Sequence, residues 1–250
     1  MDIHVVTLFP EQLERALEFG VTGRALATEL ARLTTWNPRD YADDERGTVD
    51  DRPFGGGPGM VFKAQVLASC LAAVKRQAPQ ATVRYLSPQG RQIRQAELAG
   101  WAKEPSQIWL CGRYEGIDER LVEGDIDEEW SLGDFVLSGG EPAALTVIDG
   151  LLRLLPGTLG HDASAAEDSF SDGLLDCPHY TRPEAWRGLD VPAVLKSGDH
   201  GAIARWRQQQ ALGRTWERRP ELLARRNMTA EERQLLVEYL EQRRLALNEK

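Results

Sequence analysis

Apolar residues follow two patterns along the first two-thirds of the chain, one typical of strands and the other of helices. Short runs rich in β-branched and aromatic residues predict buried strands at residues 3–9, 33–36, 82–86 and 107–111. Apolar positions spaced three and four residues apart predict helices at residues 11–19, 23–31, 61–77, 91–101 and 141–155. Pro10 stands where the first helix begins, a position that proline favours. The alternation indicates βαβ units around a parallel sheet.

The pattern changes after Pro156 and Gly157, which end the last of these helices. Residues 160–173 are small, polar and acidic, as is typical of a linker. Beyond them the strand signals vanish, residues 198–212 have helical spacing, and residues 229–232 form a capping box that opens a last helix. One face of that helix holds Leu235, Leu236, Tyr239 and Leu240. We therefore expect an α/β domain at 1–159, a linker at 160–173 and a small all-helical domain at 174–250.

Glycine-rich segments follow two of the expected strands. Residues 87–90 come directly after the strand at 82–86, and residues 112–118 come directly after the strand at 107–111. Because ligands of open α/β sheets bind beyond the carboxyl ends of the strands, the two segments are expected to be neighbours in a small-molecule site. Residues 39–59 form a charged, glycine-rich stretch with little periodicity, and a loop of this length is usually functional or mobile.

The composition narrows the class of protein. A chain of 250 residues with 42% apolar content can bury a substantial core. No apolar run approaches the roughly 18 residues needed to span a bilayer, and the first residues lack the features of a signal peptide. These observations predict a cytoplasmic protein without a membrane partner. Cys70, Cys111 and Cys177 are odd in number and widely spaced, which argues against a disulfide framework or a thiolate zinc site.

The net charge of −9 is unevenly distributed along the chain. Residues 1–170 contain 16 basic and 27 acidic residues, giving −11, whereas residues 171–250 contain 14 and 12, giving +2. Within 205–226 lie Trp206, Trp216 and seven arginines, at positions 205, 207, 214, 218, 219, 225 and 226. Such a segment can bind phosphate and stack on bases, although it is also typical of a solvated helical face.

Composition alone leaves the ligand open. No P-loop or dinucleotide-binding glycine motif occurs, and Pro58 removes an amide donor from the glycine run at 55–59. Carboxylates in the other loops would repel an anion and suit a cationic or zwitterionic ligand such as S-adenosylmethionine. A magnesium-dependent phosphohydrolase would also gather carboxylates, and the segment 205–226 by itself fits a non-catalytic RNA-binding protein. Both alternatives stay open at this point.

Longer motifs point to one family. They are DDRPFGGGPG at 50–59, YLSPQG at 85–90, GRYEGIDER at 112–120, EDSF at 167–170 and DCPHYTRP at 176–183. In this order they resemble the motifs of the bacterial tRNA (guanine-N1) methyltransferases, the TrmD family of the SPOUT class. The resemblance implies an α/β fold with a SPOUT-type parallel sheet and a trefoil knot, in a homodimer with its active sites at the subunit interface. It further implies methylation of N1 of guanine 37, the nucleotide 3′ of the anticodon in tRNA.

The same resemblance implies which residues bind S-adenosylmethionine, the methyl donor. They are Tyr85, Leu86, Ser87, Pro88, Gln89, Gly112, Tyr114, Glu115, Gly116, Ser131, Leu132, Gly133, Asp134, Phe135, Val136, Leu137, Gly139 and Gly140. These positions explain the glycines, because main-chain groups can approach an adenine closely only where no Cβ intrudes. Where the family often reads Gly-Gly-Glu-Leu-Pro, this chain has Pro142 directly after Glu141, one position early.

Two further residues carry the implied chemistry. Asp168 resembles the general base that removes the proton from guanine N1, and Arg153 resembles the arginine that stabilises charge developing at O6. Glu115 resembles a residue that contacts the donor's positive charge or helps hold Mg²⁺, which the family uses, and the metal ligands stay unassigned. The resemblance also implies tRNA contacts at Asp50, Arg52, Gly57, His179 and Arg214.

Overall fold

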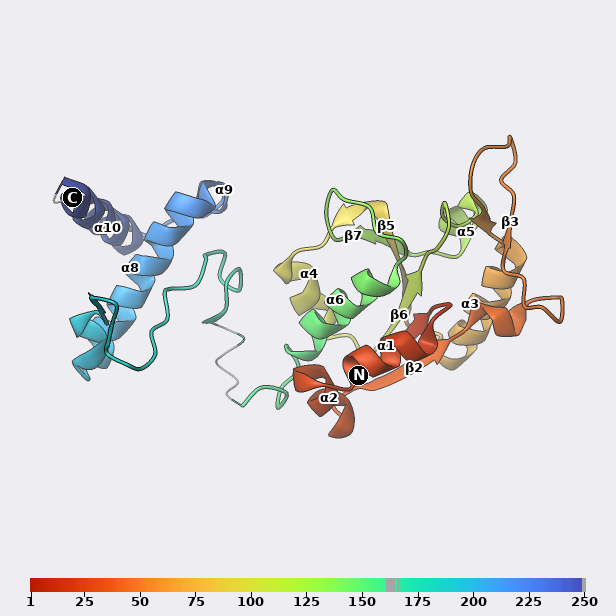
Figure 1. Ribbon diagram of the computed structural model, residues 1–250, viewed down its shortest axis with the longest axis horizontal. Helices are drawn as coiled ribbons and strands as arrows, with labels where there is room; N and C mark the ends of the chain where they lie inside the picture. The colour runs from red at the N-terminus through yellow and green to blue at the C-terminus, as the bar shows by residue number, and fades with distance from the viewer. Residues whose placement is uncertain (161–164, 166, 249–250) are drawn as a thin grey trace. The chain divides into compact units, whose positions relative to one another are not determined.

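The computed structural model describes residues 1–160, 165 and 167–248 and divides into two compact units, Met1–Asp162 and Ala163–Lys250 (Figure 1). The division falls inside the linker expected at 160–173, of which residues 161–164 and 166 lie outside the described part. No helix in the described ranges is long and apolar enough to cross a membrane.

The first unit is built on a parallel sheet. Among residues 1–160, five strands pair in the order β2-β1-β6-β5-β7, with every neighbouring pair parallel. They are β1 (Asp2–Val6), β2 (Arg32–Trp36), β5 (Thr82–Gln92), β6 (Ser106–Cys111) and β7 (Glu128–Ser131). The mixed α/β architecture with a parallel sheet, expected from the alternating pattern, is therefore confirmed.

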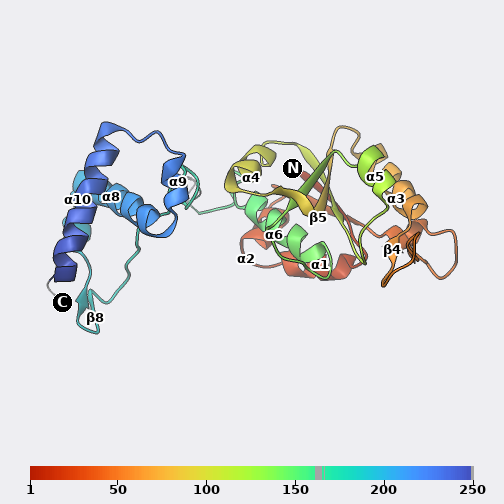
Figure 2. The same cartoon turned by 90° about the horizontal axis from the view of Figure 1, so that it is seen from above.

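Helices cover both faces of this sheet (Figure 2). On one face lie α1 (Pro10–Leu17), α2 (Gly20–Ala27), α4 (Gln95–Trp101) and α6 (Glu141–Leu152), packed on the side chains of Ile3, Val5 and Trp109. On the other lie α3 (Ala64–Gln77) and α5 (Glu119–Gly124), packed on Val6, Ile108 and Leu110. Successive strand residues thus point to opposite cores, as the pleat requires. Pro10 stands in the first turn of α1, as expected.

The first unit differs from the prediction in two places. The strand expected at 82–86 continues to Gln92, and its pairing with β7 is interrupted between Leu86 and Arg91, so the expected loop 87–90 is an irregular part of a strand. An added Cβ on Gly90 would overlap the backbone of Trp130, which explains why glycine is needed there. Strand β7 and helix α5 were not expected, because the acidic segment 119–129 has neither clear periodicity nor an apolar run.

The stretch 39–59 is not a simple loop. It contains a 3₁₀ turn, η1 (Pro38–Tyr41), and β3 (Asp50–Asp51), which pairs antiparallel with β4 (Val61–Phe62). The helix expected at 61–77 accordingly begins only at Ala64. The result is an arm, residues 50–62, whose tip carries the fully exposed side chain of Phe54.

A buried arginine joins β5 to β7 and α4. Arg84 is 2% exposed and donates to Glu104 Oε1 and Oε2 at 2.7 and 2.8 Å and to Glu128 Oε2 at 2.7 Å. Its guanidinium carbon lies 4.8 Å from the ring centre of Trp101 and 5.5 Å from that of Trp109. Burial alone would raise the pKa of Glu128, but hydrogen bonds from Trp130 and Arg84 outweigh it and lower that pKa.

The second unit is mainly helical. Its described elements include α8 (His200–Arg218), α9 (Pro220–Ala224) and α10 (Ala230–Asn248), packed around Leu174, Leu212 and Leu235. The capping box is confirmed, since the Glu232 amide donates to Thr229 Oγ1 at 3.1 Å and the Thr229 amide donates to Glu232 Oε2 at 2.8 Å.

The prediction of an all-helical second domain was wrong, because β8 (Ala185–Trp186) pairs with β9 (Leu189–Asp190) in a short hairpin followed by a 3₁₀ turn, η2 (Ala193–Lys196). A hairpin of two residues per strand leaves no alternating pattern in the sequence. Leu240, expected on the buried face of the last helix, is 36% exposed.

Replacing Arg84 with methionine is expected to lower the free energy of unfolding by about 3–5 kcal/mol, because it leaves two partly buried carboxylates without their partner. Urea denaturation followed by circular dichroism measures the change. Arg24→Met is the control, since Arg24 is exposed on α2 and makes no ion pair among the described residues. Equal stability of the two variants would contradict the structural role of Arg84.

Candidate functional site

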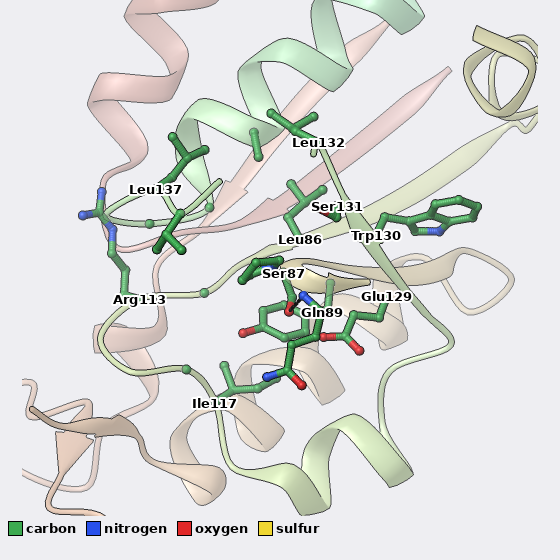
Figure 3. A pocket seen from close by; sticks show the side chains of 18 of the residues that line it. Leu86, Ser87, Gln89, Arg113, Ile117, Glu129, Trp130, Ser131, Leu132 and Leu137 are labelled. Atoms are coloured by element: carbon green, nitrogen blue, oxygen red, sulfur yellow. Dashed lines mark hydrogen bonds between the residues drawn. The ribbon is translucent and has the colours of Figure 1, made fainter. Parts of the chain in front are cut away.

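Three chain segments meet at the carboxyl ends of β5, β6 and β7 and enclose a pocket (Figure 3). Residues 85–89 come from β5, residues 112–117 follow β6, and residues 129–133 and 135–140 come from β7 and the loop after it. The glycine-rich segments 87–90 and 112–118 are therefore neighbours, as the sheet topology predicts.

Two glycines allow the backbone segments to approach each other. A Cβ on Gly140 would lie 2.6 Å from Cys111 Cα and 3.0 Å from the Gly112 nitrogen, and the Gly140 amide donates to the Gly112 carbonyl at 2.9 Å. A Cβ on Gly112 would lie 2.8 Å from the ring and hydroxyl of Tyr85. No other residue type fits at these two positions without displacing its neighbours.

A buried carboxylate anchors the crossing of these segments. Glu141 is 0% exposed; its Oε1 accepts from Thr7 Oγ1 and its Oε2 from Arg113 Nε, both at 2.8 Å. Arg113 also donates to the Ser138 carbonyl at 3.1 Å, and its guanidinium lies 4.5 Å from the ring centre of Phe9. The start of α6, the loop after β1 and the loop after β6 are thereby held together.

Hydroxyl groups fix the local shape of two pocket segments. Ser87 Oγ accepts from the Gln89 amide at 3.1 Å, and Ser131 Oγ both accepts from the Gly133 amide and donates to the Gly133 carbonyl at 3.1 Å.

Burial, followed by the charges of Glu129 and Glu119, raises the pKa of Tyr85 to about 12. The phenol therefore stays protonated and is available as a hydrogen-bond donor at the pocket floor.

One wall of the pocket is apolar yet open to solvent. Phe135, Val136 and Leu137 are 55%, 83% and 40% exposed. Large apolar side chains in this state mark a surface that a ligand or partner covers.

Most residues assigned to donor binding from the sequence line this one pocket. They are Tyr85, Leu86, Ser87, Pro88, Gln89, Gly112, Tyr114, Glu115, Gly116, Ser131, Leu132, Gly133, Phe135, Val136, Leu137, Gly139 and Gly140. Asp134 is exposed and is not among the lining residues. Glu129 and Trp130 also line the pocket and were missed because their strand, β7, was not recognised. Pro142 stands in the first turn of α6, where proline is accommodated, so its shifted position leaves the helix intact.

The arm reaches the pocket loop through its base. The Glu115 amide donates to the Met60 carbonyl at 2.9 Å, and the Phe62 amide donates to the Gly116 carbonyl at 3.0 Å. Burial and the nearby Asp50 carboxylate, to which Tyr114 hydrogen-bonds, raise the pKa of Tyr114. Asp50 thus lies beside the pocket loop, whereas Arg52 and Gly57 lie towards the arm's tip.

The two residues expected to carry the chemistry belong to different units. Arg153 directly follows α6 in the first unit. Asp168 is half-buried and lies ahead of Leu174 in the second unit.

The second unit holds the remaining expected tRNA contacts. His179 is exposed and lies with Nε2 2.7 Å from Asp176 Oδ2. Of the seven arginines at 205–226, Arg205 pairs with Glu238, Arg219 with Glu221 and Arg226 with Glu232. Within the described residues no ion pair engages Arg207, Arg214, Arg218 or Arg225. The first three share one face of α8, since they are seven and four residues apart.

The side chains of the described residues do not form an evident magnesium site. Among residues 1–160, 165 and 167–248, the group with ligand atoms within 4.8 Å of one another is Asp176, Cys177 and His179. Burial and the Asp176 charge raise the pKa of the Cys177 thiol, and Mg²⁺ prefers oxygen ligands over sulfur and nitrogen. These residues therefore do not fit magnesium held by the protein alone.

Comparison with known proteins agrees with the resemblance that the sequence motifs indicate. The family model described as "tRNA (Guanine-1)-methyltransferase TrmD" matches residues 1–225. The chain is 57% identical over 242 residues to a protein of Stutzerimonas stutzeri strain A1501, covering 96% of this chain and 97% of the relative. It is 58% identical over 239 residues to one of Pseudomonas fluorescens strain SBW25, covering 95% and 96%. Both relatives are named tRNA (guanine-N(1)-)-methyltransferase.

Gly140→Ala is expected to lower the free energy of unfolding by about 1–3 kcal/mol, because its Cβ forces apart the backbones of residues 111–112 and 140. Urea denaturation measures the effect. Gly100→Ala is the matched control, since Gly100 lies in α4 with no atom within 4 Å of an added Cβ. The control should gain about 0.5–1 kcal/mol, and a similar gain for Gly140→Ala would contradict the close approach.

Proposed function

Because the chain belongs to the tRNA (guanine-1)-methyltransferase family, we propose that it transfers a methyl group from S-adenosylmethionine to N1 of guanine 37 in tRNA. The observation that carries this proposal is the pocket at the carboxyl ends of β5, β6 and β7, whose walls include residues 85–89 and 112–117 of the motifs by which the chain resembles the family. The proposal separates this protein from a phosphohydrolase, which would need no methyl donor.

S-adenosylmethionine supplies an electrophilic methyl group on a sulfonium. The chain's part is to bind and orient it. Gly112 and Gly140 let the loops after β6 and β7 lie close together, and both loops line the pocket with main-chain groups for contacts to adenine and ribose. The exposed side chains of Phe135 and Leu137 offer apolar cover for the adenine. Carboxylates at the rim, Glu115, Glu119 and Glu129, provide a field that favours the positive charge of the donor.

Guanine N1 bears a proton in the neutral base, so it becomes a good nucleophile only when a base removes that proton. We assign this role to Asp168. As the N1–H bond breaks towards the carboxylate, negative charge develops on guanine O6, and Arg153 stabilises it as a hydrogen-bond donor. N1 then forms its bond to the methyl carbon while the carbon–sulfur bond breaks, and S-adenosylhomocysteine leaves.

Three features of the assembly are part of the same proposal. The loop 131–140 passes close to the backbone of residues 111–112, an arrangement that supports a trefoil knot. A homodimer would bring Asp168 of one subunit to the pocket of the other and cover part of the apolar wall. The reaction takes place in the cytoplasm, with Asp50, Arg52, Gly57, His179 and Arg214 as tRNA contacts.

Incubation of the full chain with unmodified tRNA transcript and methyl-labelled S-adenosylmethionine is expected to place label on N1 of guanine 37, read by nuclease digestion and mass spectrometry. A transcript with adenine at that position should stay unlabelled. Absence of label on the guanine transcript would refute the proposed activity, and label at another guanine would refute the assigned position.

Asp168→Asn is expected to reduce the single-turnover rate by roughly 10²–10⁴-fold, because the amide cannot accept the N1 proton. The dissociation constant for S-adenosylmethionine, measured by calorimetry, should stay unchanged. Glu167→Gln removes a neighbouring exposed carboxylate and should keep nearly full activity. An equal loss in both variants would remove Asp168 from the role of base.

A further inference from the structure

The β8–β9 hairpin of the second unit projects large side chains without contributing to a core. All four of its strand residues are exposed, with Trp186 at 62% and Leu189 at 75%. An isolated two-stranded hairpin is marginally stable in water. Because Trp186 is not buried within the described unit, its side chain is available to a partner.

The turn of the hairpin is strained. Its two central residues, Arg187 and Gly188, both have positive φ, 52° and 78°. A two-residue turn of this kind favours asparagine or aspartate followed by glycine, and a long side chain in the first position is unusual. Strain of order 1 kcal/mol or more that persists without a packing reason points to a functional role for the side chain.

The strained conformation places the Arg187 guanidinium over the indole of Trp186, 5.2 Å from its ring centre. The pair presents an exposed aromatic surface with a positive charge. Close to it along the chain, a shallow pocket is lined by Tyr180, Thr181, Arg182, Glu184, Val191 and Lys196. Tyr180 is 50% exposed, and Lys196 pairs with Glu184 at 3.3 Å. Tyr180 in turn lies 6.4 Å from the ring of Trp206 on α8.

We infer that Trp186 and Arg187 form a stacking site for an unpaired nucleotide of the tRNA, separate from the arginines of α8. The inference rests on the proposed function. Stacking on an aromatic ring with an adjacent arginine is how proteins bind single-stranded bases, and Arg182, which makes no ion pair in the described part of the chain, is available to the attached phosphate. A nucleic acid matches this surface better than an apolar protein partner does, because Arg187 and Arg182 place positive charge beside the ring.

Trp186→Ala in the full-length protein is expected to raise the dissociation constant and KM for unmodified tRNA roughly 5- to 100-fold, as measured for loss of base stacking. The kcat at saturating tRNA and the dissociation constant for S-adenosylmethionine should stay unchanged. Leu245→Ala, which removes an apolar side chain of the same 62% exposure from α10, should leave all four constants at wild-type values.

Arg187→Asn separates a structural role from a binding role. Asparagine suits the turn, so the melting temperature should stay equal or rise, while tRNA affinity falls. A variant with wild-type tRNA affinity, or one that loses affinity only by unfolding, would overturn the stacking site. The stacking site would also be overturned if Trp186→Ala kept its tRNA affinity and light scattering showed a changed molar mass. That result would assign the hairpin to a protein contact.

Binding and methylation are measured separately, so the two proposals can fail separately. Wild-type protein that binds tRNA without methylating it would refute the activity, and the stacking site would still be decided by the affinities of the variants. If the wild-type protein methylates guanine N1 and Trp186→Ala has the same KM and dissociation constant for tRNA as the wild type, the stacking site alone is refuted.

Discussion

The candidate site depends on the hydrogen bonds that the buried carboxylate of Glu141 accepts. It accepts hydrogen bonds from Thr7 and Arg113, which come from two other segments at the same edge of the sheet. A fully buried carboxylate is stable only with such partners, so the three segments are held in one arrangement. With them in place, Gly140 lies against Cys111 and Gly112, and the pocket between β5, β6 and β7 has a fixed floor.

The sequence predicts those elements whose stability comes from local pattern. The strands at β1, β2 and β6 and the helices α1, α3 and α8 were expected because apolar periodicity is strong there. The strand β7 and the hairpin β3–β4 were not, since Glu128 and Asp50 are poor strand formers and are held by tertiary pairing. The extension of β5 to Gln92 likewise depends on a partner strand that no local pattern reveals.

The candidate site was predictable to the extent that its chemistry lies in contiguous motifs. Motif matching found 17 of the pocket-lining residues, and sheet topology independently placed two of the motifs together. Motif matching also assigned Asp134 to donor binding, although Asp134 does not line the pocket and its neighbours do. The charge distribution assigned seven arginines to one basic segment, of which Arg205, Arg219 and Arg226 are engaged by carboxylates of the same unit. Such pairing depends on helices meeting in space.

Cys111 lies directly under the backbone crossing at Gly140 and is 1% exposed. Burial, reinforced by the charge of Glu141, raises the pKa of its thiol well above the ordinary value. Only a thiolate reacts efficiently with alkylating reagents, so the Cys111 thiol is unreactive while Gly140 stays packed against it. The rate at which this thiol is alkylated in native buffer therefore reports how often the contact between Gly140 and residues 111–112 opens.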